Sequence, residues 1–455
     1  MKILFIQQLR YEWLAPMIFS AIAKEREIET KLIIEADINK AATQALKEEP
    51  DAIIFASITT GNYYFVSQCA NLIKKKKNIF IMAGGIHITM YYEKLDMKSI
   101  DIFGIGEGEV AFSGILDMLY FQKGVEQVPG IAYMNNGKMI VNPPRYIENL
   151  DMLPMPDYQL YYRYSFFRNE KIRMFYSGRG CRYNCKYCCV PYANNDKKAI
   201  RKRSPLSLVN EILYVDQKYG MKAAFFQDDT FLQDKEWLKE FLELYKKMVN
   251  KKFMCLSNAQ ELDKDTINIL KESGCVSIGI GVECINSNIR RQVNRMDTDE
   301  QIMKALYYTK KAGIRITTFN MVGLPNQSLQ DIIDTIDFYR YFKVDSVWCV
   351  LYQDFMNKEK SLWESKVGNF YTTYSGQIQN KEQIETIQKL MPYIVKYPKL
   401  LNKIENLWIK KLSYFLFAFD SYIREVTIWE RSYWLSFRIG VYNQLCYKKN
   451  MKGID

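Results

Sequence analysis

Apolar and polar positions along the first 141 residues follow two periods. Short apolar runs predict buried strands, and segments with apolar residues three and four positions apart predict helices. The runs give strands at 2–6, 30–35, 52–57, 78–83 and 101–104, and helices at 15–24, 39–47 and 65–74. Strands and helices that alternate in this way predict an α/β unit, an open parallel sheet with helices on both faces.

The same alternation returns over residues 171–354. Strands are predicted at 173–177, 223–227, 253–257, 276–282, 315–322 and 346–352, and helices at 206–218, 235–249, 263–272, 299–312 and 329–341. Six parallel strands joined by helices predict a partial (β/α)6 barrel, with its chemistry at the C-terminal ends of the strands. Residues 142–170 begin with a proline-rich stretch and are interpreted as a linker. Residues 355–455 have a helical pattern and predict a third, C-terminal unit.

Composition narrows the function classes. The chain has 455 residues, of which 48% are hydrophobic, so a folded globular protein is expected. Its single histidine, His87, excludes sites that need several histidines. Ten cysteines are too few for a disulfide scaffold, and no apolar run is long enough to predict a transmembrane helix. With no signal peptide pattern at residues 1–12, the chain is expected to be cytoplasmic.

The net charge of +12 favours an anionic substrate or partner without selecting one. Part of this excess lies in the basic and aromatic region 355–455, which is interpreted as a helical cap over the barrel. Contact of this region with a membrane surface is the less favoured alternative. Nucleic-acid binding is not expected, because the lysines are scattered and no binding module is recognisable.

The most specific motif is a group of three cysteines, Cys181, Cys185 and Cys188, on one short segment. Thiolates at these spacings can bind three irons of a 4Fe–4S cluster from a single loop, which leaves the fourth iron open to a chelating ligand. Gly178 and Gly180 allow this loop to turn tightly. A structural zinc site is the alternative, but it would need a fourth ligand such as Cys189.

With this motif the sequence resembles the radical SAM superfamily, and in particular the subgroup with an N-terminal cobalamin-binding-type domain. The resemblance covers about residues 1–355. It implies a 4Fe–4S cluster and S-adenosyl-L-methionine (SAM) as cofactors, and a Rossmann-like N-terminal domain. It also implies an electron donor such as flavodoxin or ferredoxin.

Further motifs match the family in chain order after the cysteines. By resemblance, Asp228 and Asp229 would hold the SAM amino group, Glu283 would lie near the ribose or substrate, and all three are candidate catalytic residues. The remaining SAM contacts that the resemblance implies are Tyr187, Asn294, Arg295, Asn320, Gly323 and Pro325. A carboxylate can accept from the SAM ammonium, and a guanidinium can bind its carboxylate.

Three N-terminal segments resemble the cobalamin-binding part of the subgroup. The candidate contacts are Ser57, Thr59, Gly84, Gly85, His87, Gly106, Glu107 and Gly108. The Asp-x-His-x-x-Gly loop that supplies a cobalt ligand in many cobalamin proteins is absent, and Gln7 and Gln8 follow the first strand instead. His87 is therefore interpreted as a structural hydrogen-bonding residue at the domain interface. The family includes members with and without bound cobalamin, so both possibilities stay open.

The implied activity is cleavage of SAM to a 5′-deoxyadenosyl radical that abstracts hydrogen from an unactivated carbon. Bound cobalamin would make the chain a C-methyltransferase acting on a small molecule, for instance an anionic sugar or lipid. Without cobalamin, the same barrel would catalyse a dehydration, rearrangement or cyclisation, with the N-terminal domain as scaffold. A non-catalytic metal- or cofactor-binding protein is the alternative from another class.

Overall fold

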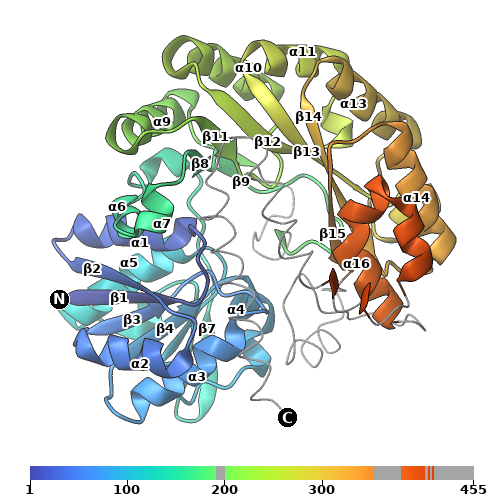
Figure 1. Ribbon diagram of the computed structural model, residues 1–455. Coiled ribbons are helices and arrows are strands. Elements are labelled where there is room, and N and C mark those ends of the chain that lie inside the picture. The colour runs from blue at the N-terminus through green and yellow to red at the C-terminus, as the bar shows by residue number, and fades with distance from the viewer. Residues whose placement is uncertain (191–199, 353–380, 405–407, 410–411, 414–455) are drawn as a thin grey trace.

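The computed structural model describes all residues except 191–199, 353–380, 405–407, 410–411 and 414–455. Its two large sheets lie side by side, one built by the N-terminal part of the chain and one by the central part (Figure 1). This confirms the predicted α/β class with an open parallel sheet and a partial barrel. The four sequence-based domain boundaries, 1–141, 142–170, 171–354 and 355–455, stay predictions.

The N-terminal sheet has seven strands in the order β2-β1-β3-β4-β5-β6-β7, of which the first five are parallel. The strands are β1 Lys2–Gln7, β2 Glu29–Ile34, β3 Ala52–Phe55, β4 Phe80–Gly84, β5 Ile102–Gly104, β6 Ile131–Asn135 and β7 Lys138–Asn142. The helices are α1 Leu14–Lys24, α2 Ile38–Lys47, α3 Tyr63–Lys74, α4 Ile86–Tyr91 and α5 Gly108–Phe121, with 3-10 turns η1 Tyr92–Lys94 and η2 Val125–Gln127.

Alternate residues of the N-terminal strands face opposite sides of the sheet. In β1, Ile3 and Phe5 pack in one buried cluster with residues of α1 and α5, whereas Leu4 and Ile6 pack in another with residues of α2 and α3. Both sets are almost fully buried. Strands buried on both faces have continuous apolar sequences, which is why the sequence predicts them so well.

The antiparallel hairpin β6–β7 is a difference from the sequence-based prediction, which ended the sheet at β5. Its turn is Asn136-Gly137, and both residues have positive φ, 48° and 77°. An Asn-Gly pair of this kind is the preferred two-residue hairpin turn. The hairpin extends the sheet beyond β5 by antiparallel pairing.

The central sheet is parallel throughout, in the order β15-β14-β13-β12-β11-β8. Its strands are β8 Ile172–Phe175, β11 Ala223–Phe226, β12 Lys252–Asn258, β13 Cys275–Glu283, β14 Arg315–Val322 and β15 Ser346–Leu351. The helices are α9 Pro205–Tyr219, α10 Lys235–Leu244, α11 Lys264–Glu272, α12 Ser287–Gln292, α13 Asp299–Lys311 and α14 Leu329–Tyr341, with short turns η4 Tyr245–Val249 and η5 Ala259–Glu261. The long helices lie on the outer face of the curved sheet (Figure 1).

Only part of the predicted C-terminal helical region lies within the described residues. Helix α16, Lys381–Lys396, is followed by the 3-10 turn η7, Pro398–Lys403. α16 lies against β15, the last strand of the central sheet (Figure 1). The Gln388 side chain donates from Nε2 to the Cys349 carbonyl of β15 at 2.8 Å. The prediction that this region caps the barrel mouth falls mostly on residues outside the described part.

The segment between the two sheets is well packed. It contains the short elements η3 Leu150–Met152, α6 Gln159–Tyr162 and α7 Ser165–Arg168. Tyr158, Tyr161 and Tyr162 are at most 2% exposed. Tyr161 donates to Gln7 of β1 at 2.6 Å, while Tyr158 donates to Glu211 of α9. These tyrosines therefore hydrogen-bond the segment to strand β1 of the N-terminal sheet and to helix α9 of the central part of the chain. No helix among the described residues is long and apolar enough to cross a membrane.

Candidate functional site

The three motif cysteines lie on the loop that connects two very short strands. β9, Gly178–Arg179, pairs antiparallel with β10, Arg201–Lys202, and the loop runs between them. Cys185 is buried at 7% exposure, and Cys181 and Cys188 are partly buried. The loop follows β8, so the cysteines lie at the C-terminal end of a barrel strand, as predicted.

Each of the three sulfur atoms has a hydrogen-bond donor or a cation beside it. Gln233 donates from Nε2 to the Cys181 sulfur at 3.3 Å, and the Val190 backbone N–H donates to the Cys188 sulfur at 3.4 Å. The Arg295 guanidinium lies beside Cys185. Burial raises the pKa of all three thiols, and these donors and the cation partly offset that effect. Bound metal deprotonates a thiol outright, and such donors then stabilise the thiolate.

The geometry of the described residues does not favour the zinc alternative. Among them, no group of three or more His, Cys, Asp or Glu side chains is placed to hold a single metal ion. A cubane cluster makes a different demand, because each thiolate binds a separate iron and the three sulfurs need not converge on one point.

Glu283 and Arg295 come together beside Tyr187, which lies in the cysteine loop between Cys185 and Cys188. Glu283 ends β13 at a register shift and has a positive φ of 67°, which is uncommon for a residue other than glycine. Burial raises its pKa to about 7, although the neighbouring Arg295 guanidinium opposes that rise. A side chain at Gly281 would meet both groups, with Arg295 Nη2 only 2.9 Å from the added carbon. Glycine at 281 therefore leaves room for the Glu283 and Arg295 side chains.

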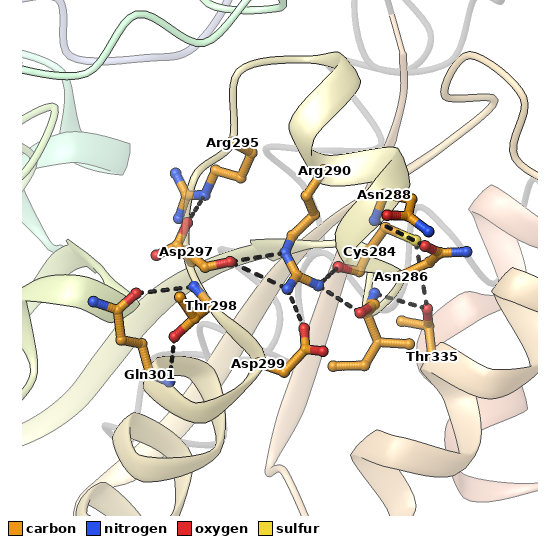
Figure 2. Close-up of polar contacts among 11 residues, drawn as sticks. Cys284, Asn286, Asn288, Arg290, Arg295, Asp297, Thr298, Asp299, Gln301 and Thr335 are labelled. Atoms are coloured by element: carbon orange, nitrogen blue, oxygen red, sulfur yellow. Dashed lines mark hydrogen bonds and ion pairs between the residues drawn. The ribbon is translucent and has the colours of Figure 1, made fainter.

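Arg290 holds the backbone that carries this group (Figure 2). It is completely buried and donates to the carbonyls of Cys284, Ile285 and Asp297. Arg295 in turn forms an ion pair with Asp297 at 2.5 Å through Nε and donates from Nη2 to the Gly281 carbonyl. The connection from β13 to α13 is thus tied together by two arginines. Asn294, which has a positive φ of 56°, is exposed and ends the turn after α12.

The two aspartates after β11 have different surroundings. Asp228 is buried and accepts from the Ser177 backbone N–H and hydroxyl, with Lys202 at 3.6 Å. Asp229 lies near the Gly180 backbone N–H, and burial together with the Asp228 charge raises its pKa to about 6. Asp228 therefore fixes the segment before the cysteines, and Asp229 lies next to the cysteine loop.

The predicted SAM contacts Asn320, Gly323 and Pro325, in and after β14, are held mainly by contacts within the protein. Asn320 is 1% exposed, and its amide bonds to Thr318, to the Trp348 carbonyl and to the Tyr339 hydroxyl. Gly323 has a φ of 82°, and its N–H donates to Gln327. Pro325 follows within the same turn. The turn lies at the C-terminal end of β14, on the same edge as Glu283.

In the N-terminal domain, Ser57 and Gly85 pack backbone against backbone. A side chain at Gly85, whose φ is 138°, would come within 2.1 Å of the Ile58 N atom. Ile58 N–H donates to the Gly84 carbonyl, and Thr59 N–H to the Asn62 side chain. A Cβ atom added at Gly84 would make only ordinary van der Waals contacts, with the backbone of Gly104. Gly85 is therefore needed for this close loop packing, whatever ligand approaches.

His87 is 2% exposed and lies between the rings of Tyr63 and Tyr91, with centroids 4.7 and 5.0 Å away. Its Nδ1 is 3.0 Å from the Thr60 hydroxyl, and its Nε2 has no hydrogen-bond partner in the described structure. Burial lowers its pKa to about 3, which keeps the ring neutral. The Thr60 contact lies within the N-terminal domain, whereas the cluster of Met90 and the neighbouring Tyr91 packs against Cys189 of the cysteine loop.

The segment Gly106, Glu107 and Gly108 faces the cysteine loop. Glu107 lies 2.9 Å from Arg179 and also pairs with Arg201. Gly106 has a φ of 74° and packs near Tyr146, and Gly108 lies against the Phe19 ring. Glu109, in the first turn of α5, pairs with Arg179 at 2.5 Å. Both carboxylates are therefore bound to arginines at the base of the cysteine loop.

Sequence reasoning missed Gln8 and Lys202. Gln8 follows β1 and is 1% exposed, yet neither polar atom of its side chain has a partner among the described residues. Lys202 donates to Ser177 at 2.7 Å and lies over the Trp237 ring at 4.6 Å. In the sequence, Gln8 stands out only because residues 7–10 replace the Asp-x-His-x-x-Gly loop. That its side-chain amide is unpaired among the described residues is visible only in the structure. No local signal marks Lys202, because its partners come from distant segments.

Comparisons with known proteins agree with this geometry. The family model of the radical SAM superfamily matches residues 175–339, and the B12 binding domain model matches residues 9–116. An uncharacterized methyltransferase of Pyrococcus horikoshii is 27% identical over 331 residues, which are 71% of each chain. The cytidylyl-2-hydroxyethylphosphonate methyltransferase of Streptomyces wedmorensis is 22% identical over 61% of this chain and 58% of its own length.

The fold also has a solved counterpart. The cobalamin-dependent S-adenosylmethionine radical enzyme OxsB, with aqua-cobalamin and S-adenosylmethionine bound, superposes with a TM-score of 0.68 at 15% identity, covering 100% of this chain and 80% of that one. This likeness concerns the fold. With both family models matched in the predicted order, the chain contains a domain of the radical SAM superfamily over residues 175–339 and, N-terminal to it, a B12-binding domain over residues 9–116.

Proposed function

We propose that this radical SAM enzyme is a cobalamin-dependent methyltransferase that acts on a carbon of a small molecule. The observation that carries the proposal is the contact between the C-terminal edges of the two sheets. Tyr11, after β1, donates to Gln227 after β11 at 2.6 Å. Cys189 packs against the cluster of Met90 and Tyr91 in α4, and Glu109 pairs with Arg179. A ligand on the edge of the N-terminal sheet would therefore lie against the barrel mouth.

The residues of the barrel fit the cofactors of the superfamily. Three thiols with donors on their sulfurs suit a 4Fe–4S cluster, and the open iron, SAM and cobalamin together supply a 5′-deoxyadenosyl radical and a methyl group. In the proposal, Asp229 accepts from the SAM ammonium and Arg295 binds its carboxylate. Glu283 and Tyr187 line the ribose side. Asp228 and Asn320 do not contact SAM in this proposal. They stabilise the site by hydrogen-bonding to the backbone of Ser177 and of Trp348, respectively.

The N-terminal domain offers a fit for cobalamin at the topological switch point. In the parallel order 2-1-3-4-5, β2 is added on one side of β1 and β3 on the other, so the order of strand addition reverses between β1 and β3. Ligands of such sheets bind beyond the C-terminal ends of these two strands. Gln8 follows β1, and Ser57 and Thr59 follow β3. An unpaired buried amide is costly, and so is an unpaired ring nitrogen such as His87 Nε2. Both are proposed to face the corrin or its polar side chains.

Replacing Gln8 by leucine tests this fit. Because the amide is buried and has no partner among the residues that the structure describes, the Gln8→Leu apoprotein is expected to unfold at the same or a higher urea concentration than the wild type. Its dissociation constant for aquocobalamin, measured by absorbance titration, is expected to rise about fivefold, the loss of roughly one hydrogen bond.

Gln7 provides the matched control. Its amide donates to the Leu9 and Tyr11 carbonyls at 2.6 and 2.9 Å and accepts from Tyr161. Gln7→Leu should therefore lower the unfolding midpoint. A Gln8→Leu protein that is destabilised like Gln7→Leu and binds cobalamin normally would contradict the proposed contact.

The substrate is proposed to be a small anionic molecule, for instance a phosphorylated sugar or lipid headgroup. The support is the net charge of +12 and the phosphonate substrate class named for the Streptomyces relative. Flavodoxin or ferredoxin is the proposed electron donor, since the cluster must be reduced by one electron before SAM is cleaved.

The decisive experiment uses protein purified without oxygen and supplied with cobalamin. Iron, sulfide and cobalt are quantified, and the reduced protein is then incubated with SAM that carries a deuterated methyl group and with candidate anionic substrates. A methyltransferase is expected to bind about one cobalt and to form both S-adenosylhomocysteine and 5′-deoxyadenosine with a deuterium-labelled product. Stoichiometric iron and 5′-deoxyadenosine with no cobalt and no S-adenosylhomocysteine would reject methyl transfer.

That second outcome would support a cobalamin-free lyase or cyclase. One observation favours this alternative: Gly85 and Glu107, both proposed cobalamin contacts, are also engaged within the protein. An N-terminal domain retained as scaffold would show the same contacts.

A further inference from the structure

The loop that carries the cysteines is held at its base by the N-terminal domain. β9 and β10 form a two-residue ribbon in which Arg179 and Arg201 lie directly opposite each other. Like charges at opposite positions of an antiparallel pair repel. Both arginines are largely buried, with side-chain exposures of 19% and 13%, so solvent screens this repulsion weakly.

Two carboxylates of the N-terminal domain neutralise the ribbon. Glu107 bridges the arginines, with one oxygen 2.9 Å from Arg179 and 3.0 Å from Arg201, and Glu109 forms a two-point contact with Arg179 at 2.5 and 3.2 Å. Burial alone would raise the pKa of Glu109, but the Arg179 guanidinium outweighs it and holds this pKa below its usual range. Both carboxylates lie at the N-terminus of α5, where the helix dipole also favours negative charge.

We propose that Glu107 and Glu109 are positioning residues for the iron–sulfur cluster. Their side chains pair with the arginines of β9 and β10, and we infer that they act through Arg179, which precedes Cys181 by two residues. Docking of the N-terminal domain thus fixes the start and the end of the cysteine loop together. The cluster would depend on this domain even if the domain bound no cobalamin. The inference rests on the radical SAM assignment and is independent of methyl transfer.

The experiment compares Glu109→Gln with Asp117→Asn. Asp117 lies on the same helix and pairs with Arg26 at 2.9 Å, so the control also removes a carboxylate from an arginine pair, away from the cysteine loop. After anaerobic reconstitution without cobalamin, iron per chain and the electron paramagnetic resonance spectrum of the reduced cluster are measured, with and without SAM. Glu109→Gln is expected to shift that spectrum and to slow SAM cleavage roughly 10- to 100-fold, as for other residues that orient metal ligands. Asp117→Asn should match the wild type.

A double-mutant cycle shows whether Glu109 acts through Arg179. Arg179→Gln alone should affect the cluster like Glu109→Gln, and the double variant should be no worse than either. If Glu109→Gln folds poorly, Glu107→Gln takes its place, because Arg179 then keeps its contact with Glu109. A variant with the iron content, spectrum and SAM cleavage of Asp117→Asn would overturn the inference. Additive effects in the cycle would overturn the route through Arg179.

Discussion

Cys185→Ala is expected to abolish SAM cleavage. Cys185 is the most buried of the three motif cysteines, and the Arg295 guanidinium lies beside its sulfur. Without this thiolate one iron loses its protein ligand, and a cubane held by two cysteines is not retained. After anaerobic reconstitution we expect iron far below that of the wild type, loss of the visible charge-transfer absorption and no detectable 5′-deoxyadenosine.

Cys189→Ala is the matched control for this prediction. Cys189 is adjacent to the motif and packs against the cluster formed by Met90 and Tyr91, and it is a candidate for the fourth ligand that a zinc site would need. With an iron–sulfur cluster, the Cys189→Ala protein should keep its iron and cleave SAM. Loss of metal from Cys189→Ala and Cys185→Ala alike, with zinc rather than iron in the wild type, would restore the zinc alternative.

Arg290→Met is expected to lower the free energy of unfolding by roughly 3–5 kcal/mol, the range for breaking a buried charged network. The Arg290 side chain is 0% exposed and bonds to three backbone carbonyls and to Asp299. Methionine fills the volume but donates no hydrogen bond, so these buried carbonyls lose their partners (Figure 2). The midpoint of urea unfolding, followed by circular dichroism, measures the change.

The neighbouring Arg291 serves as control, because it is exposed on the same helix, α12. Arg291→Met should change stability by about 0.5 kcal/mol or less. Since the Arg290 network also places Glu283 and Arg295, Arg290→Met should weaken SAM binding at temperatures where the protein is still folded. Equal midpoints for the two variants would show that the network contributes little to the fold.

Most of the fold could be predicted from the sequence because the parallel strands of both sheets are rich in apolar residues, and several are buried along their whole length or nearly so. All six barrel strands were predicted within a few residues of their observed bounds, as were the five parallel strands of the N-terminal sheet. The β6–β7 hairpin was missed although its Asn136-Gly137 turn is a local signal, because β7 is mostly exposed and its apolar run, residues 139–141, is short. The tyrosines of residues 142–170 were assigned to a linker because their partners, Gln7 and Glu211, lie far away in sequence.

The sequence by itself determined the chemistry of the cysteine loop and the two-sheet plan. Cysteine spacing along one loop is local, and strand and helix periods are local as well. Only the tertiary structure decided which polar residues meet. It brings Glu283 and Arg295 to Cys185 and pairs Glu107 and Glu109 with Arg179 across the domain boundary. It also buries the Gln8 amide with no partner within the described part of the chain. The physical reason is that pairing and desolvation depend on neighbours brought together by folding, which no local pattern encodes.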